Sequence, residues 1–67
     1  MDIAKYLESR GWKYKGDTGY KNGKYSLYIF GNGIVDINNL YNGMHLFVGR
    51  LLTEEKADII IEALGIT

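Results

Sequence analysis

The chain contains no cysteine, so neither disulfide bonds nor a thiolate-bound metal can supplement its hydrophobic core. With 67 residues it is near the size at which a single core is only just sufficient for stability. The absence of cysteine also fits a reducing compartment. We therefore expect one small domain, residues 1–67, stabilised by its apolar residues alone or with the help of an oligomeric partner.

Net charge, a signal sequence and long apolar segments are missing as well. Eight basic and eight acidic residues cancel, whereas nucleic-acid-binding modules usually carry a basic excess. The segment from Met1 to Lys5 has no basic region followed by an apolar run, so we expect no signal peptide. No apolar stretch approaches the roughly 20 residues of a membrane-spanning helix. These features predict a cytoplasmic protein that binds no membrane.

The motifs of common catalytic and cofactor sites are also absent. The sequence has no G-x-S-x-G, no P-loop and no dinucleotide fingerprint. His45 is the only histidine, and it cannot form a recognisable zinc site without cysteines. As a general base it would need an orienting acid and a pocket, but the expected strand pairing sets Asp36 opposite Gly49 rather than His45. We expect a surface or interface histidine, no enzyme activity, no cofactor, no metal and no small-molecule ligand.

Glycine turns, by contrast, are frequent in the middle of the chain. Asn22-Gly23, Gly31-Asn32-Gly33 and Asn42-Gly43 each separate runs of strand-forming residues, and Asn-Gly is a strong hairpin signal. Helical patterns flank these strands. Asp2 and Thr53 are the expected N-caps, and the apolar stripes of the two helices comprise Ile3, Tyr6 and Leu7, then Ala57, Ile60, Ile61 and Leu64. Gly11 and Gly65 supply the left-handed C′ positions, with Trp12 and Ile66 following them in Schellman-type endings.

The predicted fold is therefore α+β: an N-terminal helix, a three- to four-stranded antiparallel β-meander and a C-terminal helix (α-β-β-β-β-α). The segment from Trp12 to Lys15 looks extended, and residues 16–19 form a turn or a bulge. The sheet then has four strands, which we favour, or three with an irregular edge. We expect both helices on one face of the sheet; the alternative places them on opposite faces.

The turns also predict the strand register. Two-residue loops at the first and third turns and a three-residue loop at the second give a consistent set of cross-strand pairs. These are Tyr20 with Tyr25, Phe30 with Ile34, Ile29 with Val35, Leu27 with Ile37, Ile37 with Val48 and Asn39 with Leu46. The predicted core face then comprises Tyr25, Leu27, Ile29, Val35, Ile37, Met44, Leu46 and Val48.

The same registers predict a second face rich in aromatic residues. Its candidate partner-binding residues are Tyr28, Phe30, Ile34, His45 and Phe47, with Asp36 and Gly49 beside them. With both helices on the other side, this face would be an exposed apolar patch, and such patches mark interaction sites. If one helix covered it, the aromatics would instead be ordinary core residues. Sheet-on-sheet packing in a homodimer would bury the same residues.

We therefore predict a small noncatalytic protein-interaction module that self-associates or binds and inhibits a partner protein. Small size, neutral charge and an aromatic face are compatible with an accessory protein of a phage or mobile element. The alternative is a single-stranded nucleic-acid-binding protein that stacks bases on Tyr28, Phe30 and Phe47, with Lys24 and Arg50 at the rim. Zero net charge disfavours this alternative.

Charge is unevenly distributed along the chain. Four basic residues gather in the first third: Lys13, Lys15, Lys21 and Lys24. Four acidic residues gather near the end: Glu54, Glu55, Asp58 and Glu62. The lysines either steer a partner or, as we favour, keep an edge strand soluble.

Overall fold

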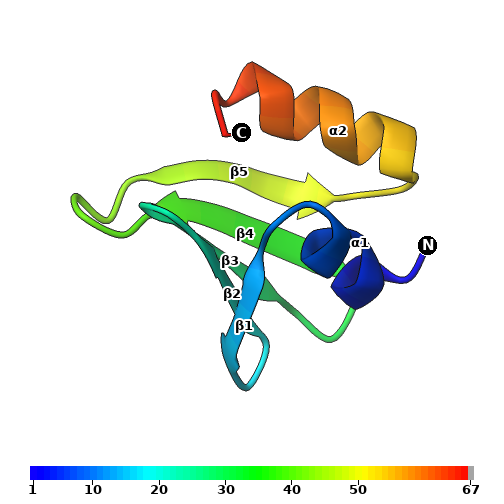
Figure 1. Cartoon of the computed structure of the whole chain (residues 1–67), viewed down its shortest axis with the longest axis horizontal. Coiled ribbons are helices and arrows are strands. Elements are labelled where there is room, and N and C mark those ends of the chain that lie inside the picture. Colours follow the sequence, from blue (N-terminus) through cyan, green and yellow to red (C-terminus); the bar gives the residue numbers. More distant parts are fainter. Residues whose placement is uncertain (67) are drawn as a thin grey trace.

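The computed structural model describes residues 1–66 and shows two helices and one five-stranded antiparallel sheet (Figure 1). The strands follow one another across the sheet in chain order, β1-β2-β3-β4-β5. The elements are α1 (Ile3–Ser9), β1 (Lys13–Gly16), β2 (Gly19–Asn22), β3 (Tyr25–Ile29), β4 (Ile34–Asn39), β5 (His45–Arg50) and α2 (Glu54–Ala63). The predicted α+β class and the meander are confirmed.

The preferred number of four strands is one too few. The chain reverses direction at Asp17 and Thr18, where the backbone of Asp17 has a φ of +49° and Gly16 pairs with Gly19. Residues 16–19, for which the sequence left a turn or a bulge open, include this turn, so the first segment is a hairpin of two short strands. Lys15 is the extra residue in β1 where the pairing shifts, a β-bulge.

Both helices begin and end where the sequence predicts. The Asp2 carboxylate accepts a hydrogen bond from the Lys5 amide at 3.1 Å, and the Thr53 hydroxyl accepts one from the Lys56 amide at 3.1 Å. At the C-terminal end of α1, the Trp12 amide donates to the carbonyl of Leu7 at 3.0 Å. In α2 the Ile66 amide donates to Ile61 at 3.1 Å. Both endings are Schellman motifs, with Gly11 and Gly65 at positive φ.

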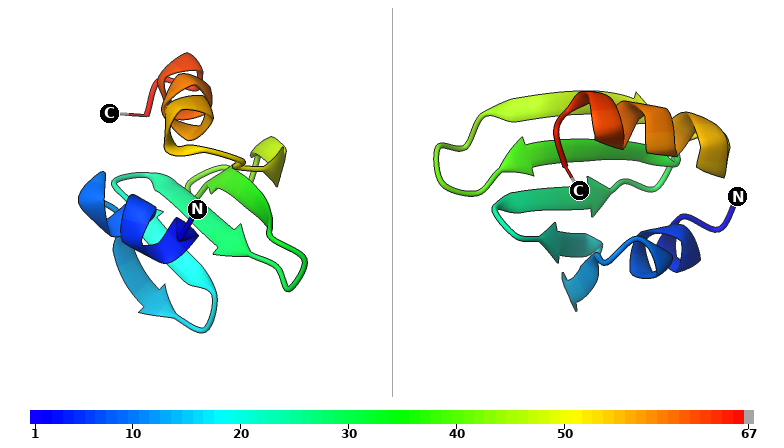
Figure 2. Two further views of the ribbon diagram at one scale, coloured as in Figure 1. Left: turned by 90° about the vertical axis from the view of Figure 1, so that its right-hand side faces the viewer. Right: turned by 45° about the horizontal axis from the view of Figure 1, so that its top comes forward.

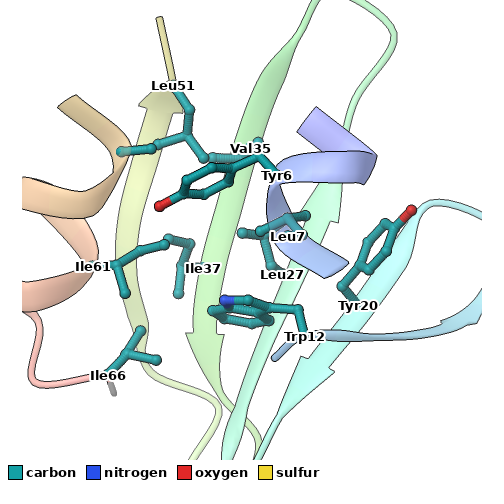
Figure 3. Packing of buried hydrophobic residues seen from close by; sticks show 11 residues of the cluster. Tyr6, Leu7, Trp12, Tyr20, Leu27, Val35, Ile37, Leu51, Ile61 and Ile66 are labelled. Carbon is teal, nitrogen blue, oxygen red and sulfur yellow. The ribbon is translucent and has the colours of Figure 1, made fainter. Parts of the chain in front are cut away.

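Both helices cover the same face of the sheet, as predicted (Figure 2). Side chains from the helices and the segments flanking them meet the middle strands in a single apolar cluster (Figure 3). Its buried members are Tyr6, Leu7, Trp12, Tyr20, Leu27, Val35, Ile37, Leu51, Ala57, Ile61 and Ile66. We call the helix-covered side the inner face and the other side the outer face.

The β3–β4 register is confirmed, whereas the β2–β3 register is displaced. Ile29 pairs with Val35 across the three-residue loop, in which Gly33 has a φ of +81°. In the first hairpin, however, Tyr20 pairs with Leu27 instead of Tyr25. The two-residue turn consists of Gly23 and Lys24, with Gly at the first central position as a type II′ turn requires. A shift of two residues keeps each side chain on its predicted face.

The β4–β5 register is wrong by one residue, which turns β5 over. Ile37 pairs with Phe47 instead of Val48, and the pairing shifts again around Leu46, the extra residue of a second bulge. The bulge is the cause, because its one-residue shift turns the strand over from Phe47 onward. The loop has four residues instead of two, which shifts the neighbouring pairing by two residues and leaves His45 on its predicted face. The Asn39 amide accordingly donates its hydrogen bond to the carbonyl of Met44 at 2.9 Å.

Phe47 consequently lies on the inner face, half-buried against the core, and is not available as a partner-binding residue. Met44 and Val48, predicted to be core residues, are instead exposed, and Leu46 is half-buried at the bulge. Gly49 accommodates this arrangement. A Cβ at Gly49 would stand 2.8 Å from Cζ of Phe47, so the ring occupies the space that a side chain would take.

Candidate interaction surface

The outer face of the sheet has no helix over it (Figure 2). Cross-strand pairing and strand alternation place the following side chains there: Lys13, Lys15, Lys21, Ser26, Tyr28, Phe30, Ile34, Asp36, Asn38, His45, Val48 and Arg50. Four of the five candidate residues, all except Phe47, therefore lie on this uncovered face. Val48 joins them, a residue that the sequence prediction assigned to the core.

The apolar part of the outer face lies toward the β3–β4 loop. Phe30 is 52% exposed, Val48 is 61% exposed and Tyr28 is 38% exposed, while Ile34 is half-buried. Phe30 lies beside Ile34, with its amide donating to the Ile34 carbonyl at 2.8 Å, and the row of Tyr28, Asp36 and Val48 comes next. We call Tyr28, Phe30, Ile34 and Val48 the apolar patch.

A lysine fixes one side of the apolar patch. The ammonium group of Lys15 donates to the Ser26 hydroxyl at 2.6 Å and to the Tyr28 hydroxyl at 2.9 Å. It also lies 4.5 Å from the centre of the Tyr28 ring, within cation–π range. The hydrogen bond from Lys15 lowers the pKa of Tyr28. Ser26 is fully buried beneath this contact, so Lys15 joins a buried hydroxyl to the Tyr28 side chain and orients the Tyr28 ring.

His45 and Asp36 lie together, contrary to the predicted pairing. Nδ1 of His45 is 2.9 Å from Oδ1 of Asp36, because the four-residue loop places the histidine opposite Asn38, two residues along β4 from Asp36. The carboxylate orients the imidazole on an open surface. None of the described side chains that hydrogen-bond to this pair is a nucleophile, so the contact serves to hold His45 at the rim of the outer face.

Charge is divided between the sheet and the helices. Residues 13–50 carry five basic and two acidic residues, a net charge of +3, and the remaining segments carry three basic and six acidic residues, a net charge of −3. Among residues 1–66, Asp36 is the only carboxylate that strand pairing places on the outer face, and it contacts His45. The cationic residues lie mainly on β1 and β2, so the outer face has a cationic half and an apolar half.

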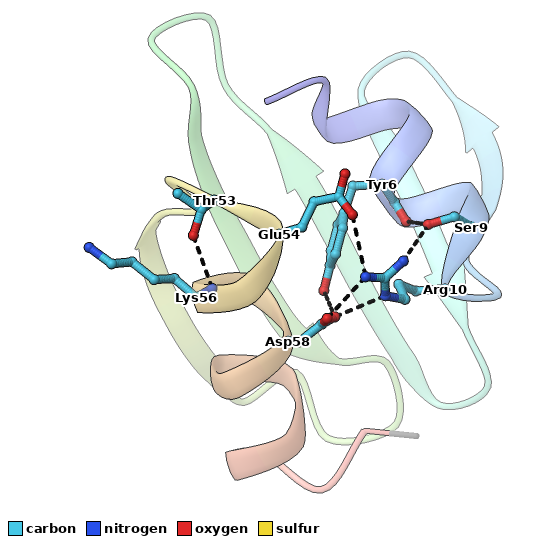
Figure 4. A network of polar contacts seen from close by, with 7 residues as sticks. All are labelled: Tyr6, Ser9, Arg10, Thr53, Glu54, Lys56 and Asp58. Carbon is cyan, nitrogen blue, oxygen red and sulfur yellow. Dashed lines mark hydrogen bonds and ion pairs between the residues drawn. The ribbon is translucent and has the colours of Figure 1, made fainter.

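The acidic helical layer is joined by one polar network (Figure 4). Arg10 at the end of α1 donates two hydrogen bonds to the Asp58 carboxylate of α2, at 2.9 and 3.0 Å, and lies 3.4 Å from Glu54. The Tyr6 hydroxyl also donates to Asp58 at 2.6 Å. The hydrogen bonds from Arg10 and Tyr6 lower the pKa of Asp58 to about 2. Burial, followed by the bond to Asp58, raises the pKa of Tyr6.

Within residues 1–66, no helix has the length and apolar character needed to cross a bilayer, and no cluster of three or more His, Asp or Glu side chains is arranged to hold a metal ion. No family model, curated protein sequence or solved structure matches the chain.

Proposed function

We propose that the protein is a noncatalytic interaction module that binds protein through the outer face of its sheet, and that its partner is a second copy of the chain. The observation that supports this is the apolar patch on a face that neither helix covers. Exposed apolar clusters with a polar rim are typical of protein-binding surfaces. The rim here consists of Asp36, His45 and Arg50.

The apolar patch is smaller than the area that a stable interface buries. At their exposures Tyr28 and Phe30 leave on the order of 200 Å² of aromatic side chain accessible to water. A stable interface buries about 800 Å² per partner. The apolar patch therefore supplies the centre of an interface, and the polar rim must contribute the rest. Such a contact would also supplement a core that is small for independent stability.

Charge favours pairing between identical copies. The formal net charge is zero, so two copies experience little long-range repulsion. Lys13 and Lys21 lie toward the strand ends opposite the apolar patch, whereas Lys15 contacts the patch at Tyr28. A two-fold axis through the apolar patch, perpendicular to the strands, stacks the two patches and places the Lys13 and Lys21 pairs of the two copies at opposite ends.

Sedimentation equilibrium over a concentration series tests this proposal. We expect reversible dimerisation of the wild type and at least a tenfold weaker dimer for Phe30→Ser and for Val48→Ser, because each replaces a central apolar contact with a hydroxyl. Ile59→Ser is the matched control, because Ile59 on α2 is also 61% exposed but lies outside the sheet. A wild type that stays monomeric at millimolar concentration, or equal weakening by Ile59→Ser, contradicts the proposal.

A second candidate is single-stranded nucleic-acid binding on the same face. The observation that favours it is the net charge of +3 on residues 13–50, which form the sheet and its turns. The acidic helical segments cancel this charge in the whole chain. Tyr28 and Phe30 would stack bases while the lysines of β1 and β2 neutralise phosphates. Phe30→Ser should then reduce affinity for an oligonucleotide of eight thymidines at low salt. Undetectable binding at 20 mM salt rejects this candidate.

A further inference from the structure

A cleft of about 580 Å³ lies at the end of the sheet opposite the apolar patch. Three lysines and a tyrosine line it: Lys13 at the start of β1, Lys21 near the end of β2, Lys24 in the β2–β3 turn and Tyr41 in the β4–β5 loop. The remaining lining residues are Gly11, Asn22 and Gly23, so none of the carboxylates within residues 1–66 lines the cleft. The first two hairpins thus bring three positive charges to one depression, and the more distant β4–β5 loop adds Tyr41.

The lysines of this cleft are arranged at a cost to stability. Lys13 and Lys21 are direct cross-strand partners, and like charges in that position destabilise a sheet. Among residues 1–66 the ion pairs involve only Arg10 and His45 as basic partners, so neither of these lysines has a compensating carboxylate. A bound anion would remove the repulsion.

Protection of an exposed edge does not explain Lys21. Lysines placed on edge strands discourage edge-to-edge pairing, and this account fits Lys13 on β1. Lys21, however, lies on β2, which is paired with β1 on one side and β3 on the other. Edge protection therefore does not account for the charge of Lys21, which lies next to a second lysine in the cleft.

Tyr41 adds an aromatic surface to the cationic cleft. It is 83% exposed, the highest value among the large apolar and aromatic residues that the structure exposes. Its loop is nevertheless well defined: the Asn39 side chain accepts the Tyr41 amide at 2.8 Å, and the Gly43 amide donates to the Asn39 carbonyl at 2.8 Å. An ordered loop that holds an aromatic ring in water is suited to stacking on a planar group.

We propose that this cleft binds the phosphate groups of a nucleotide, with Lys13, Lys21 and Lys24 neutralising the phosphate and Tyr41 stacking on the base. Its volume falls within the range of about 300–1,000 Å³ found for small-ligand sites. The nucleotide comes either free or as part of a single strand, since both offer the same phosphate and base. This inference does not depend on self-association, because the cleft and the apolar patch lie at opposite ends of the strands and involve different residues.

The test is an NMR titration of the whole chain at 20 mM salt with three probes: inorganic pyrophosphate, thymidine monophosphate and an oligonucleotide of eight thymidines. We expect the amide signals of Lys21, Asn22 and Gly23 to shift with each probe. Lys21→Gln should weaken binding about two- to fivefold, and Lys13→Gln/Lys21→Gln about tenfold, as expected for exposed charge contacts. Lys56→Gln, which changes an exposed lysine on α2, is the control and should bind as the wild type does.

Tyr41→Ser separates the contribution of the base from that of the phosphate. It should weaken binding of the two thymidine probes several-fold and leave pyrophosphate binding unchanged. Tighter binding of the oligonucleotide than of the monophosphate identifies a single strand as the source, and equal binding identifies a free nucleotide. The proposal is overturned if no probe shifts the cleft amides, or if the double lysine variant binds as tightly as Lys56→Gln.

The melting temperature shows whether each variant is folded and gives a second measure of binding. Removing one of two opposed lysines should leave the melting temperature unchanged or raise it at low salt, because the repulsion is relieved. Pyrophosphate should raise the melting temperature of the wild type and have no such effect on Lys13→Gln/Lys21→Gln, since only a folded site binds it. Equal stabilisation of both proteins by pyrophosphate contradicts the site.

Discussion

Exchanging neighbouring side chains of β5 for threonine gives the sharpest test of the strand register. Phe47 and Val48 are adjacent, yet the structure places Phe47 against the core and leaves Val48 61% exposed. Threonine is β-branched and keeps the strand propensity at both positions, so packing decides the outcome. The predicted two-residue loop at Asn42-Gly43 would reverse the two roles.

The magnitudes follow from burial. Truncating a fully buried phenylalanine costs about 3–5 kcal/mol. Because Phe47 is half-buried, we expect Phe47→Thr to reduce the free energy of unfolding by about 2–3 kcal/mol. Val48→Thr should change it by no more than about 0.5 kcal/mol. In a domain of this size these values correspond to falls in melting temperature of roughly 8–24 °C and below about 4 °C.

Urea and thermal unfolding at micromolar concentration, where self-association is minimal, measure both variants. A domain of this length has a total stability of about 3–10 kcal/mol, so Phe47→Thr removes a large part of it. A larger loss for Val48→Thr than for Phe47→Thr would refute the observed register and restore the one predicted from the turn.

Three further predictions test other features of the fold. Gly33→Ala should cost about 1–2 kcal/mol because its φ is +81°, whereas Gly31→Ala, with an ordinary φ and open space around it, should be nearly neutral; urea unfolding measures both. Gly49→Ala should lower the melting temperature, since its Cβ would stand 2.8 Å from an aromatic ring of β5, and unchanged melting contradicts that packing. Asp58 has a folded pKa of about 2, below its ordinary 3.8, so its bonds to Arg10 stabilise the fold above pH 4 and are lost as the pH falls from about 4 to 2. Asp58→Asn should therefore be less stable at pH 7 and lose less stability over that pH interval; a wild-type acid profile in this variant contradicts the assignment.

Local signals in the sequence predicted the helices well. Each helix end depends on residues within a few positions of it, such as Thr53 accepting from Lys56, and both Schellman endings form at the expected glycines. The three-residue loop before Ile34 was predicted for the same reason, since a glycine in the left-handed position fixes its geometry. These features need no information about distant parts of the chain.

The errors arose where several loop lengths suit the same residues. Asn42-Gly43 fits a two-residue turn, but Asn39 side-chain bonds and the Gly43 amide close a four-residue loop instead. The longer loop shifts the pairing by two residues and keeps the faces, whereas the bulge at Leu46 adds the one-residue shift that exchanged Phe47 for Val48 on the outer face.

The cationic cleft could not be derived from sequence spacing. The sequence shows that the lysines are close along the chain. Their position next to Tyr41 depends on which strand ends lie at the same end of the sheet. The direct opposition of Lys13 and Lys21 likewise depends on a turn at Asp17 that the sequence left undecided. Only the tertiary structure brings these lysines together with Tyr41 around one cleft.

Backbone amide signals, followed during dilution from millimolar to micromolar concentration, test directly whether the outer face is the interaction surface. We expect concentration-dependent shifts at Tyr28, Ile34 and Val48, with the exposed residues of α2 unaffected. Shifts confined to α2, or spectra that do not change over this range, would contradict this expectation.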